Sequence, residues 1–234
     1  MVAIRMISRR DLVQGLVSLA ITLAVMGAAL FLSAGTLQWQ HGLAFLAAFF
    51  LLVLASIAWL WRVNPEIFAA RRRMTGEGTK SWDKVLIPIL LAGFLATLIV
   101  AGLDAGRFHW APAPFWAVLV GYVLMVLGWL GSGWAQAVNR HFEPSVRIQT
   151  DRDHHVITTG PYAFVRHPGY VSGALLAVGI ALALGSLWAL LPAALVGVLL
   201  VIRTNLEDAT LQRELPGYAE FATRVRSKWI PGVW

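Results

Sequence analysis

The segment from 160 to 170 gathers side chains that can bind or react into one short polar stretch, Gly-Pro-Tyr-Ala-Phe-Val-Arg-His-Pro-Gly-Tyr. It lies between two long apolar stretches, and the adjacent carboxylates of Glu207 and Asp208 begin 37 residues after its end. A loop that only connects two helices needs a solvated backbone and a few charges. This loop is instead rigid, aromatic and cationic, so it predicts a site of chemistry.

The composition places that loop in a membrane protein. Of the 234 residues, 58% are hydrophobic and 13% are charged, whereas charged residues make up about a quarter of soluble domains. The mean hydropathy is +0.68. The lack of cysteine excludes disulfides, thiol nucleophiles and thiolate metal sites. We therefore predict one membrane domain, residues 1–234, with no separate soluble domain.

Apolar runs of helical length indicate how often the chain crosses the membrane. One span needs about 20 residues for a hydrocarbon core of about 30 Å. The long run at 169–202 is broken at Gly185-Ser186, which predicts two short helices in a tight hairpin. The expected fold is therefore an all-α, polytopic integral membrane bundle of six transmembrane helices. Its first four spans are expected at 12–33, 42–61, 85–103 and 114–135.

The basic residues give this bundle an orientation. Of the 19 Lys and Arg residues, 18 fall in the segments 1–11, 62–84, 136–168 and 203–234. Because cytoplasmic loops carry the excess of positive charge, these segments and both termini are expected in the cytoplasm. There the charges, Arg71-Arg72-Arg73 included, would meet anionic headgroups. The net charge of +7 therefore predicts membrane lipids as partners, and no nucleic acid.

The polar clusters of the chain all fall on this predicted cytoplasmic side. Besides the 160–170 loop, they are residues 139–144, residues 147–155, and Arg203 with the acidic pair. Four segments that meet at one membrane face predict a shared pocket. An amphipathic segment at 207–228, broken by Pro216-Gly217, is expected to form a cytoplasmic C-terminal helix over that pocket.

These residues resemble the motifs of the isoprenylcysteine carboxyl methyltransferase family. The similar features are Thr159-Gly160-Pro161-Tyr162, Arg166-His167-Pro168-x-Tyr170, a glycine-rich apolar hairpin, and the acidic pair with Leu211 and Tyr218 downstream. Asn139-Arg140-His141-Phe142 and Trp229-Ile230-Pro231-Gly232 also resemble bacterial members. The resemblance covers residues 139–234, whereas residues 1–84, a helix pair with a basic loop, carry no matched motif. The family usually has a second glutamate where this chain has Asp208.

The resemblance implies an integral membrane enzyme that uses S-adenosylmethionine, from a family related to the phospholipid N-methyltransferases. It implies a bacterial inner membrane, with the active site facing the cytoplasm. The expected catalytic residues are Arg203 and Tyr170. The residues expected to bind the cofactor are His155, Gly160, Pro161, Tyr162, Arg166, His167, Pro168, Tyr170, Glu207 and Asp208.

The residue types suit that cofactor. Carboxylates such as Glu207 and Asp208 can accept from a ribose diol or pair with an ammonium group. The 166–168 loop can hold the cofactor carboxylate, and Tyr162 and Tyr170 offer aromatic faces to adenine or to the sulfonium. Arg203 is expected to steer an anionic acceptor, because a charge at the end of an apolar helix is costly without a role.

The sequence leaves the methyl acceptor open. Methyl transfer is an in-line displacement that needs positioning and desolvation more than acid–base catalysis. The expected partner is a lipophilic small molecule, and the candidates are a lipophilic or small carboxylate or thiol, or an amine-bearing lipid.

Two other classes of function remain. Sterol reductases that use NADPH share a distantly similar His-Pro-x-Tyr and acidic pattern, although Gly160-Pro161-Tyr162 ahead of the Arg-His-Pro favours the methyltransferase. A non-catalytic transporter or scaffold is disfavoured because no expected helix carries a polar residue near its midpoint.

Some of the same residues have simpler interpretations. Arg203 and Glu207 are four residues apart and could form a surface ion pair worth a few tenths of a kcal/mol. His154-His155 invites a metal site, but no cysteine or carboxylate stands at ligand spacing, so no metal is expected.

Overall fold

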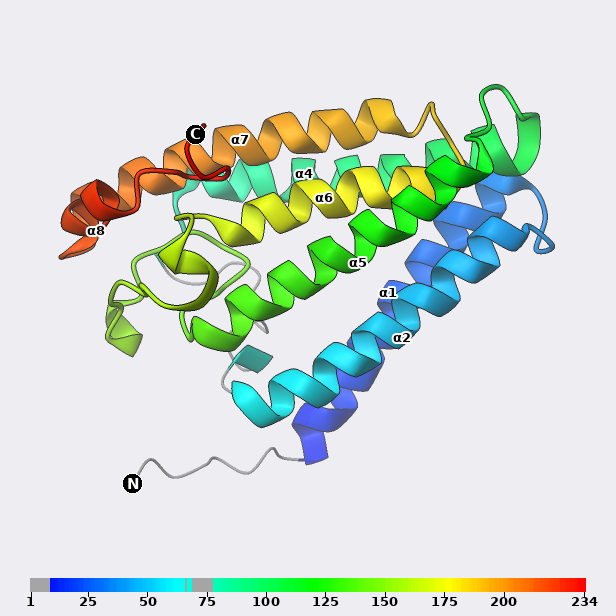
Figure 1. Ribbon diagram of the computed structural model, residues 1–234. Helices are drawn as coiled ribbons and strands as arrows, with labels where there is room; N and C mark the ends of the chain where they lie inside the picture. Colours follow the sequence, from blue (N-terminus) through cyan, green and yellow to red (C-terminus); the bar gives the residue numbers. More distant parts are fainter. Residues whose placement is uncertain (1–8, 66, 69–77) are drawn as a thin grey trace.

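The computed structural model describes residues 9–65, 67–68 and 78–234, with side chains from residue 15 onward. Within these residues the fold is all-α, as predicted, and contains a bundle of six long apolar helices (Figure 1). Five of them are long and apolar enough to cross a membrane, and α6 is shorter. The helices of the bundle are α1 (Arg9–Ala34), α2 (Gln40–Val63), α4 (Ser81–Ala101), α5 (Phe115–Val138), α6 (Pro168–Ala183) and α7 (Leu190–Glu214).

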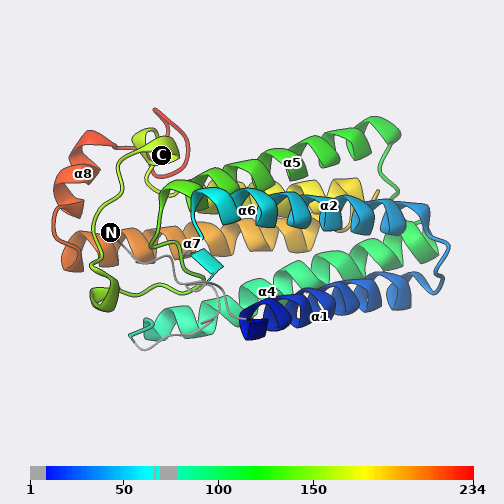
Figure 2. The same ribbon diagram turned by 90° about the horizontal axis from the view of Figure 1, so that it is seen from below.

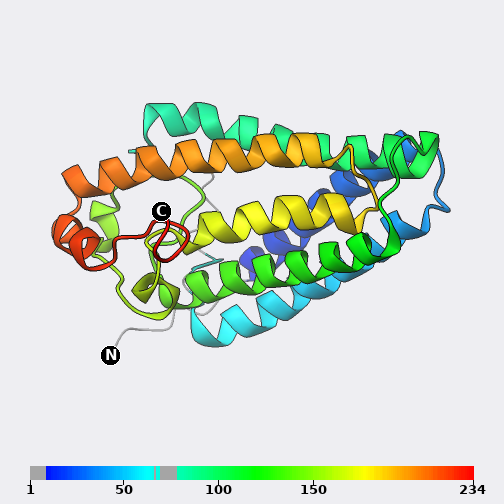
Figure 3. The same cartoon turned by 45° about the horizontal axis from the view of Figure 1, so that its top comes forward.

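Helix α6 occupies the centre of the arrangement. Figure 3 shows α6 between α5 and α7, with α4 on the far side of α7 and α2 on the far side of α5. Helix α1 lies beside α4 when the molecule is turned to show its other side (Figure 2). The predicted motifs therefore lie on α6 and α7 or in the connection between α5 and α6, and these three helices are neighbours.

Glycine allows α5 and α6 to approach closely. A Cβ atom added to Gly128 would lie 2.7 Å from the carbonyl oxygen of Ser172. One added to Gly179 would lie 2.6 Å from the backbone nitrogen of Met125. Both distances are far below van der Waals contact, so these positions admit no side chain. The close contact fixes the position of α6, whose first turn follows directly on the Arg166-His167 motif.

The predicted hairpin of two short helices is only half right. Helix α6 has 16 residues, as expected, but α7 has 25 and continues to Glu214. The helix does not end at residue 202 because its polar continuation finds partners: Thr204 and Thr210 bond to carbonyls one turn earlier, and the charged side chains bond to neighbouring segments. Arg203, Glu207 and Asp208 consequently project from one continuous helix, α7, rather than from the junction of two helices.

The C-terminal segment breaks where the sequence predicts. Helix α7 ends at Glu214, Gly217 adopts φ +81°, and a short helix α8 (Tyr218–Arg224) follows. A positive φ is easily reached only by glycine, so the turn is encoded by this residue. The expected roof over 207–228 therefore consists of the end of α7 and α8, which meet at a sharp angle (Figure 1).

The bundle has two different ends. At the site end, α5 finishes, α6 begins and α7 runs into α8, with the long connection 139–167 folded between them. At the opposite end, a π-helical segment (Gly102–Phe108) continues α4, and residues 184–189 join α6 to α7. The basic run Arg71-Arg72-Arg73, predicted to meet lipid headgroups, lies outside the described residues.

Candidate active site

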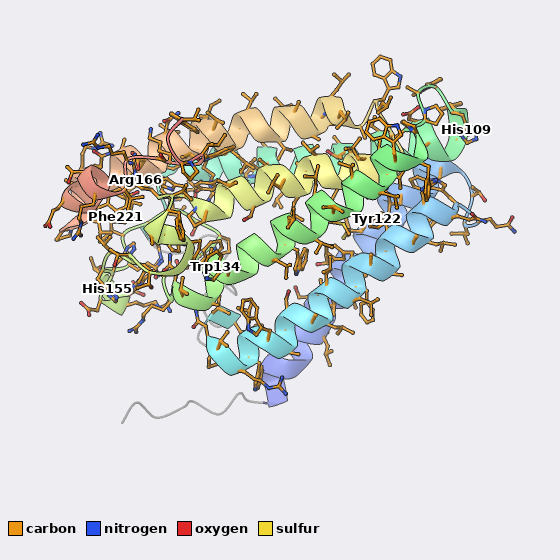
Figure 4. The ribbon with its side chains drawn as sticks, in the orientation of Figure 1. His109, Tyr122, Trp134, His155, Arg166 and Phe221 are labelled. Carbon is orange, nitrogen blue, oxygen red and sulfur yellow. The ribbon has the colours of Figure 1, made fainter. Side chains whose placement is uncertain are left out.

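A cavity of about 620 Å³ lies at the site end of the bundle. Figure 4 shows the labelled residues His155, Arg166 and Phe221 gathered at this end, with His109 at the other. All three line the cavity, together with residues of α4, α5, α6 and α7. Its volume falls within the range of small-molecule sites, and the predicted convergence of the polar clusters is thus present in the fold.

The 160–163 turn is shaped by packing against α5. Gly160 has φ +60°, and a Cβ there would lie 3.1 Å from atoms of Trp134 and Val138. This turn buries Tyr162, whose hydroxyl accepts a hydrogen bond from Asn139 Nδ2 at 2.9 Å. Burial raises the pKa of Tyr162, so the phenol stays protonated at neutral pH. Gly160 and the following proline therefore support Tyr162 from behind, and Tyr162 itself faces the cavity.

Asp208 is the centre of a buried polar network. Its carboxylate accepts from Arg166 Nε at 2.8 Å and Nη2 at 3.1 Å. It also accepts from the Tyr218 hydroxyl at 3.0 Å and lies 3.1 Å from His167 Nε2. Burial raises the pKa of Tyr218, which keeps this donor protonated. Asp208 is 2% exposed and does not line the cavity, so it positions the 166–168 loop rather than facing a ligand.

The same arginine clamps the C-terminal segment onto the loop. Arg166 Nη1 donates to the carbonyls of Val225 and Arg226, both at 2.7 Å. The backbone N–H groups of Arg166 and His167 donate to the carbonyls of Ser227 and Lys228, both at 3.0 Å. The guanidinium of Arg166 is thus used within the protein. The 166–168 loop lines the cavity. The positive charge of Arg166, which was expected to hold a cofactor carboxylate, is already compensated by Asp208.

Arg203 has a partner that the sequence did not indicate. Its Nε donates to Asp83 Oδ1 at 2.7 Å and its Nη2 to Asp83 Oδ2 at 3.0 Å. Nη2 also donates to the carbonyl of Pro144 at 2.6 Å, and the guanidinium lies 5.4 Å from the centre of the Tyr170 ring. The suggested surface pair of Arg203 with Glu207 is replaced by this buried pair between α4 and α7.

Glu207 faces the cavity one helical turn further along α7. Its carboxylate accepts a hydrogen bond from the Tyr170 hydroxyl. No cation lies within ion-pair distance of it among the described residues. The predicted catalytic and cofactor-binding residues Tyr170, Arg203 and Glu207 therefore meet at one point of the cavity wall, with Tyr170 in the middle.

Three histidines form another part of the wall. The ring of His141 lies 4.6 Å from that of His154 and 4.8 Å from that of His155, centre to centre. Burial lowers the pKa of both His141 and His154 to about 4, so both are neutral at pH 7. Among the described residues, no group of three or more His, Asp or Glu side chains is placed to hold a metal ion. This wall is aromatic, and two of its three rings are neutral at pH 7.

Hydrogen bonding fixes the protonation of His141. His155 Nδ1 lies 2.9 Å from the carbonyl oxygen of Asp153, which can only accept, so this nitrogen carries a proton. His141 Nε2, 3.4 Å away, must then accept, and the His141 proton resides on Nδ1. Nδ1 is buried and has no partner among the described residues, and the same holds for Ser145 Oγ. Both residues line the cavity, and these two buried atoms keep unused hydrogen-bonding capacity behind its surface.

The structure separates the predicted site residues into two groups. One group lines the cavity: His155, Tyr162, Arg166, His167, Pro168, Tyr170, Arg203 and Glu207. Gly160, Pro161 and Asp208 lie behind this lining and shape it. Packing and hydrogen bonding within the protein explain the positions of Gly160, Pro161 and Asp208 without a cofactor. The cofactor contacts of both groups stay predictions.

Sequence reasoning missed Asp83, His154 and Ser145 as parts of the site. One signal could have found Asp83. An arginine within an apolar helix requires a carboxylate partner, and Asp83 stands at the start of the neighbouring apolar run. The orphaned Ser145 gave no signal, because its environment depends on how the 139–157 segment folds. His154 was weighed only as a metal ligand.

Fold and site together define a class: a polytopic helical membrane protein whose ligand-sized cavity is polar at the loops and apolar along α4. The comparisons then specify it. Residues 116–216, from α5 to the end of α7, match the model of the phospholipid methyltransferase family. No curated protein matches the chain. The match confirms the predicted resemblance to membrane methyltransferases, to which the isoprenylcysteine carboxyl methyltransferases are related, and it indicates a methyltransferase enzyme.

Proposed function

We propose that the protein transfers a methyl group from S-adenosylmethionine to a lipophilic acceptor at the cytoplasmic face of the membrane. The observation that carries the proposal is that one cavity has a polar part and an apolar part. Its polar part is lined by Tyr170, Glu207 and the three histidines, and its apolar part by α4 and α7. A charged, water-soluble cofactor and a lipid-like acceptor need these two environments side by side.

The polar part fits the cofactor's functional groups. The sulfonium supplies an electrophilic methyl group when the cofactor is bound. Tyr170 presents an aromatic ring and Glu207 a carboxylate without a cation partner among the described residues, and both favour a positive charge nearby. The aromatic rings of the three histidines suit an adenine ring.

The apolar part points to an acceptor from the bilayer. It is lined by Ile87, Leu90, Leu91 and Phe94 of α4 and by Leu200 of α7. Leu91 is 53% exposed on the outer surface of the bundle, so this wall of the cavity borders lipid. An acyl chain can therefore lie along α4 while the reacting group reaches Tyr170.

The charge balance favours an amine over an anion as acceptor. Asp83 already compensates Arg203, and Glu207 adds a negative charge beside it. The expectation that Arg203 attracts an anionic acceptor therefore loses its support. An amine reacts through its lone pair as free base and gives up a proton, which Glu207 is placed to accept. The name of the matched family, phospholipid methyltransferase, agrees with an amine-bearing lipid.

The test is transfer of labelled methyl from S-adenosylmethionine to vesicles of total lipid extract, with the product identified by mass. We expect a methylated amine lipid. A methyl ester or thioether would contradict the choice of acceptor, and the absence of transfer together with the absence of S-adenosylhomocysteine binding would contradict the methyltransferase. Stabilisation of the purified protein by NADPH instead would favour the reductase, and solute uptake without a methyl donor would favour a transporter.

The orientation is tested separately. Reporter fusions at residue 234 and near residue 108 should label opposite faces of the membrane, with residue 234 in the cytoplasm. Labelling of both on one face would overturn the six-span arrangement.

A further inference from the structure

Asp83 is a buried carboxylate outside the segment that matches the family. It stands in the first turn of α4, is 0% exposed and lies 33 residues before the match begins at residue 116. A buried carboxylate is costly unless it is paired and hydrogen-bonded. Here it has both kinds of partner: the guanidinium of Arg203, and the backbone N–H of Val146 at 2.6 Å.

These contacts fix the orientation of Arg203. Two parallel bonds to Asp83 use Nε and one hydrogen of Nη2, and the carbonyl of Pro144 takes the other hydrogen of Nη2. A bidentate pair of this kind allows little rotation of the guanidinium. Both N–H groups of Nη1 are left without a hydrogen-bond partner among the described residues, on a side chain that lines the cavity beside the Tyr170 ring.

One face of α4 carries this carboxylate and the apolar wall. Asp83, Ile87, Leu90 and Phe94 recur at helical spacing, and the last three line the cavity. Asp83 also holds Val146 and, through Arg203, Pro144, so α4 is connected to the segment that closes the cavity beside it. The geometry places the polar end of an acceptor at Arg203 Nη1 when its chain lies against α4.

We propose that Asp83 is a positioning residue for the methyl acceptor. It holds Arg203 so that Nη1 donates directed hydrogen bonds to oxygen atoms of the acceptor headgroup, which leaves the lone pair of the amine free to react, and it compensates the positive charge of the arginine. The proposal rests on the proposed function, because it assumes a methyl acceptor in this cavity. It adds an element of the N-terminal half, in which the sequence carries no matched motif.

The experiment compares three variants of the full-length protein with wild type. Asp83→Asn keeps the shape and removes the charge. Asp83→Leu combined with Arg203→Met replaces the buried pair by apolar residues, a change that often leaves folding intact. Glu214→Gln is the matched control, because Glu214 also joins the start of α4 to α7, through Lys80, but outside the cavity. For each, S-adenosylhomocysteine affinity is measured by calorimetry and methyl transfer with vesicles of total lipid extract.

We expect Asp83→Asn to lower kcat by about tenfold or more while cofactor affinity stays within about threefold, the pattern of an interaction made with the reacting partner. The double variant should fold, bind S-adenosylhomocysteine and transfer no methyl group. Glu214→Gln should match wild type in both measurements.

Transfer by the double variant within about threefold of wild type would show that the pair serves packing alone. A parallel loss of cofactor affinity in Asp83→Asn would assign the pair to the cofactor, and a failure of both Asp83 variants to fold would assign it to folding. Each outcome overturns the positioning role. Wild-type protein without transfer or cofactor binding would instead contradict the proposed function itself.

Discussion

Two buried polar residues at opposite ends of the bundle, Asp104 and His141, differ in how completely the protein satisfies them. At the opposite end, Asp104 is 0% exposed and accepts hydrogen bonds from Ser186 Oγ at 2.6 Å and from the backbone N–H of Ala111 at 2.7 Å. At the site end, His141 Nδ1 and Ser145 Oγ are buried on the cavity wall without a partner among the described residues. A closed network holds segments together, whereas the unpaired groups keep unused hydrogen-bonding capacity beside the cavity.

The site end also contains both arrangements within a few residues. Asp208 is enclosed by protein donors, as Asp104 is, while its neighbour Glu207 faces the cavity. Adjacent positions on α7 point about 100° apart around the helix axis. One turn of helix therefore supplies one carboxylate enclosed by the protein and another that faces the cavity. Burial and partners, rather than residue type, distinguish these two acids.

The largest effect should come from opening the closed network at the site end. Arg166→Leu removes the bidentate guanidinium from the buried Asp208 and frees the carbonyls of Val225 and Arg226, which should cost about 3–5 kcal/mol of unfolding free energy. Unfolding in mixed micelles titrated with sodium dodecyl sulfate measures it. Arg224→Leu is the control, because Arg224 makes only an exposed pair with Glu220. A loss equal to the control's would mean that the network is not closed.

Removing the carboxylate at the opposite end should destabilise the fold and leave binding intact. Asp104→Ala leaves the Ser186 hydroxyl and the Ala111 N–H unsatisfied, at an expected cost of about 3 kcal/mol. S-adenosylhomocysteine affinity, measured by calorimetry below the melting temperature, should equal that of wild type. A weaker affinity would show that Asp104 affects binding at the cavity and does not serve the fold alone.

Glu207→Gln should weaken cofactor binding and leave the stability of the fold unchanged. S-adenosylhomocysteine affinity should fall by about 2 kcal/mol, roughly 30-fold, because a charge-assisted hydrogen bond becomes a neutral one. The unfolding free energy should change little, since Glu207 bonds only to Tyr170 within the described residues. Glu220→Gln, on the exposed α8, is the matched control. Unchanged affinity would place Glu207 among the structural carboxylates.

The smallest effect concerns the histidine wall. The pKa of His141 and of His154 is lowered by burial from 6.5 to about 4, so between these values the unfolded chain binds protons that the folded protein does not. Stability should therefore fall as pH drops from about 6.5 to about 4, by about 1 kcal/mol for each histidine after allowance for solvent screening. The double variant His141→Gln, His154→Gln should lose this part of the pH dependence. An unchanged slope would contradict the buried, neutral wall.

Patterns along the chain predicted the bundle well. Apolar run lengths located the spans, and Pro216-Gly217 marked the turn after α7, because each of these features depends on residues that are close in the chain. The length of α7 was missed, because whether polar residues such as Thr204 and Asp208 remain helical depends on partners from elsewhere in the fold.

The sequence predicted which residues line the cavity better than it predicted what each of them contacts. Local motifs brought Tyr162, Tyr170 and Glu207 to the cavity, since their segments had to meet at one membrane face. The role of Arg166 depended on carbonyls 59 and 60 residues away, and that of Arg203 on Asp83, 120 residues away. Spacing within one motif carries no information on such contacts.

The shortness of α6 sets the depth of the cavity. At 1.5 Å per residue, its 16 residues span about 24 Å and the 25 residues of α7 about 37 Å, so α7 projects about 13 Å further at the site end. The floor of the cavity is thus recessed toward the acyl chains when the end of α7 lies at the membrane surface. Pulling a lipid out of a bilayer costs about 0.8 kcal/mol for each methylene exposed to water. For the lipid acceptor proposed above, a recessed floor would allow the headgroup to be reached while the acyl chains stay in the bilayer, so extraction of the lipid would not limit the reaction.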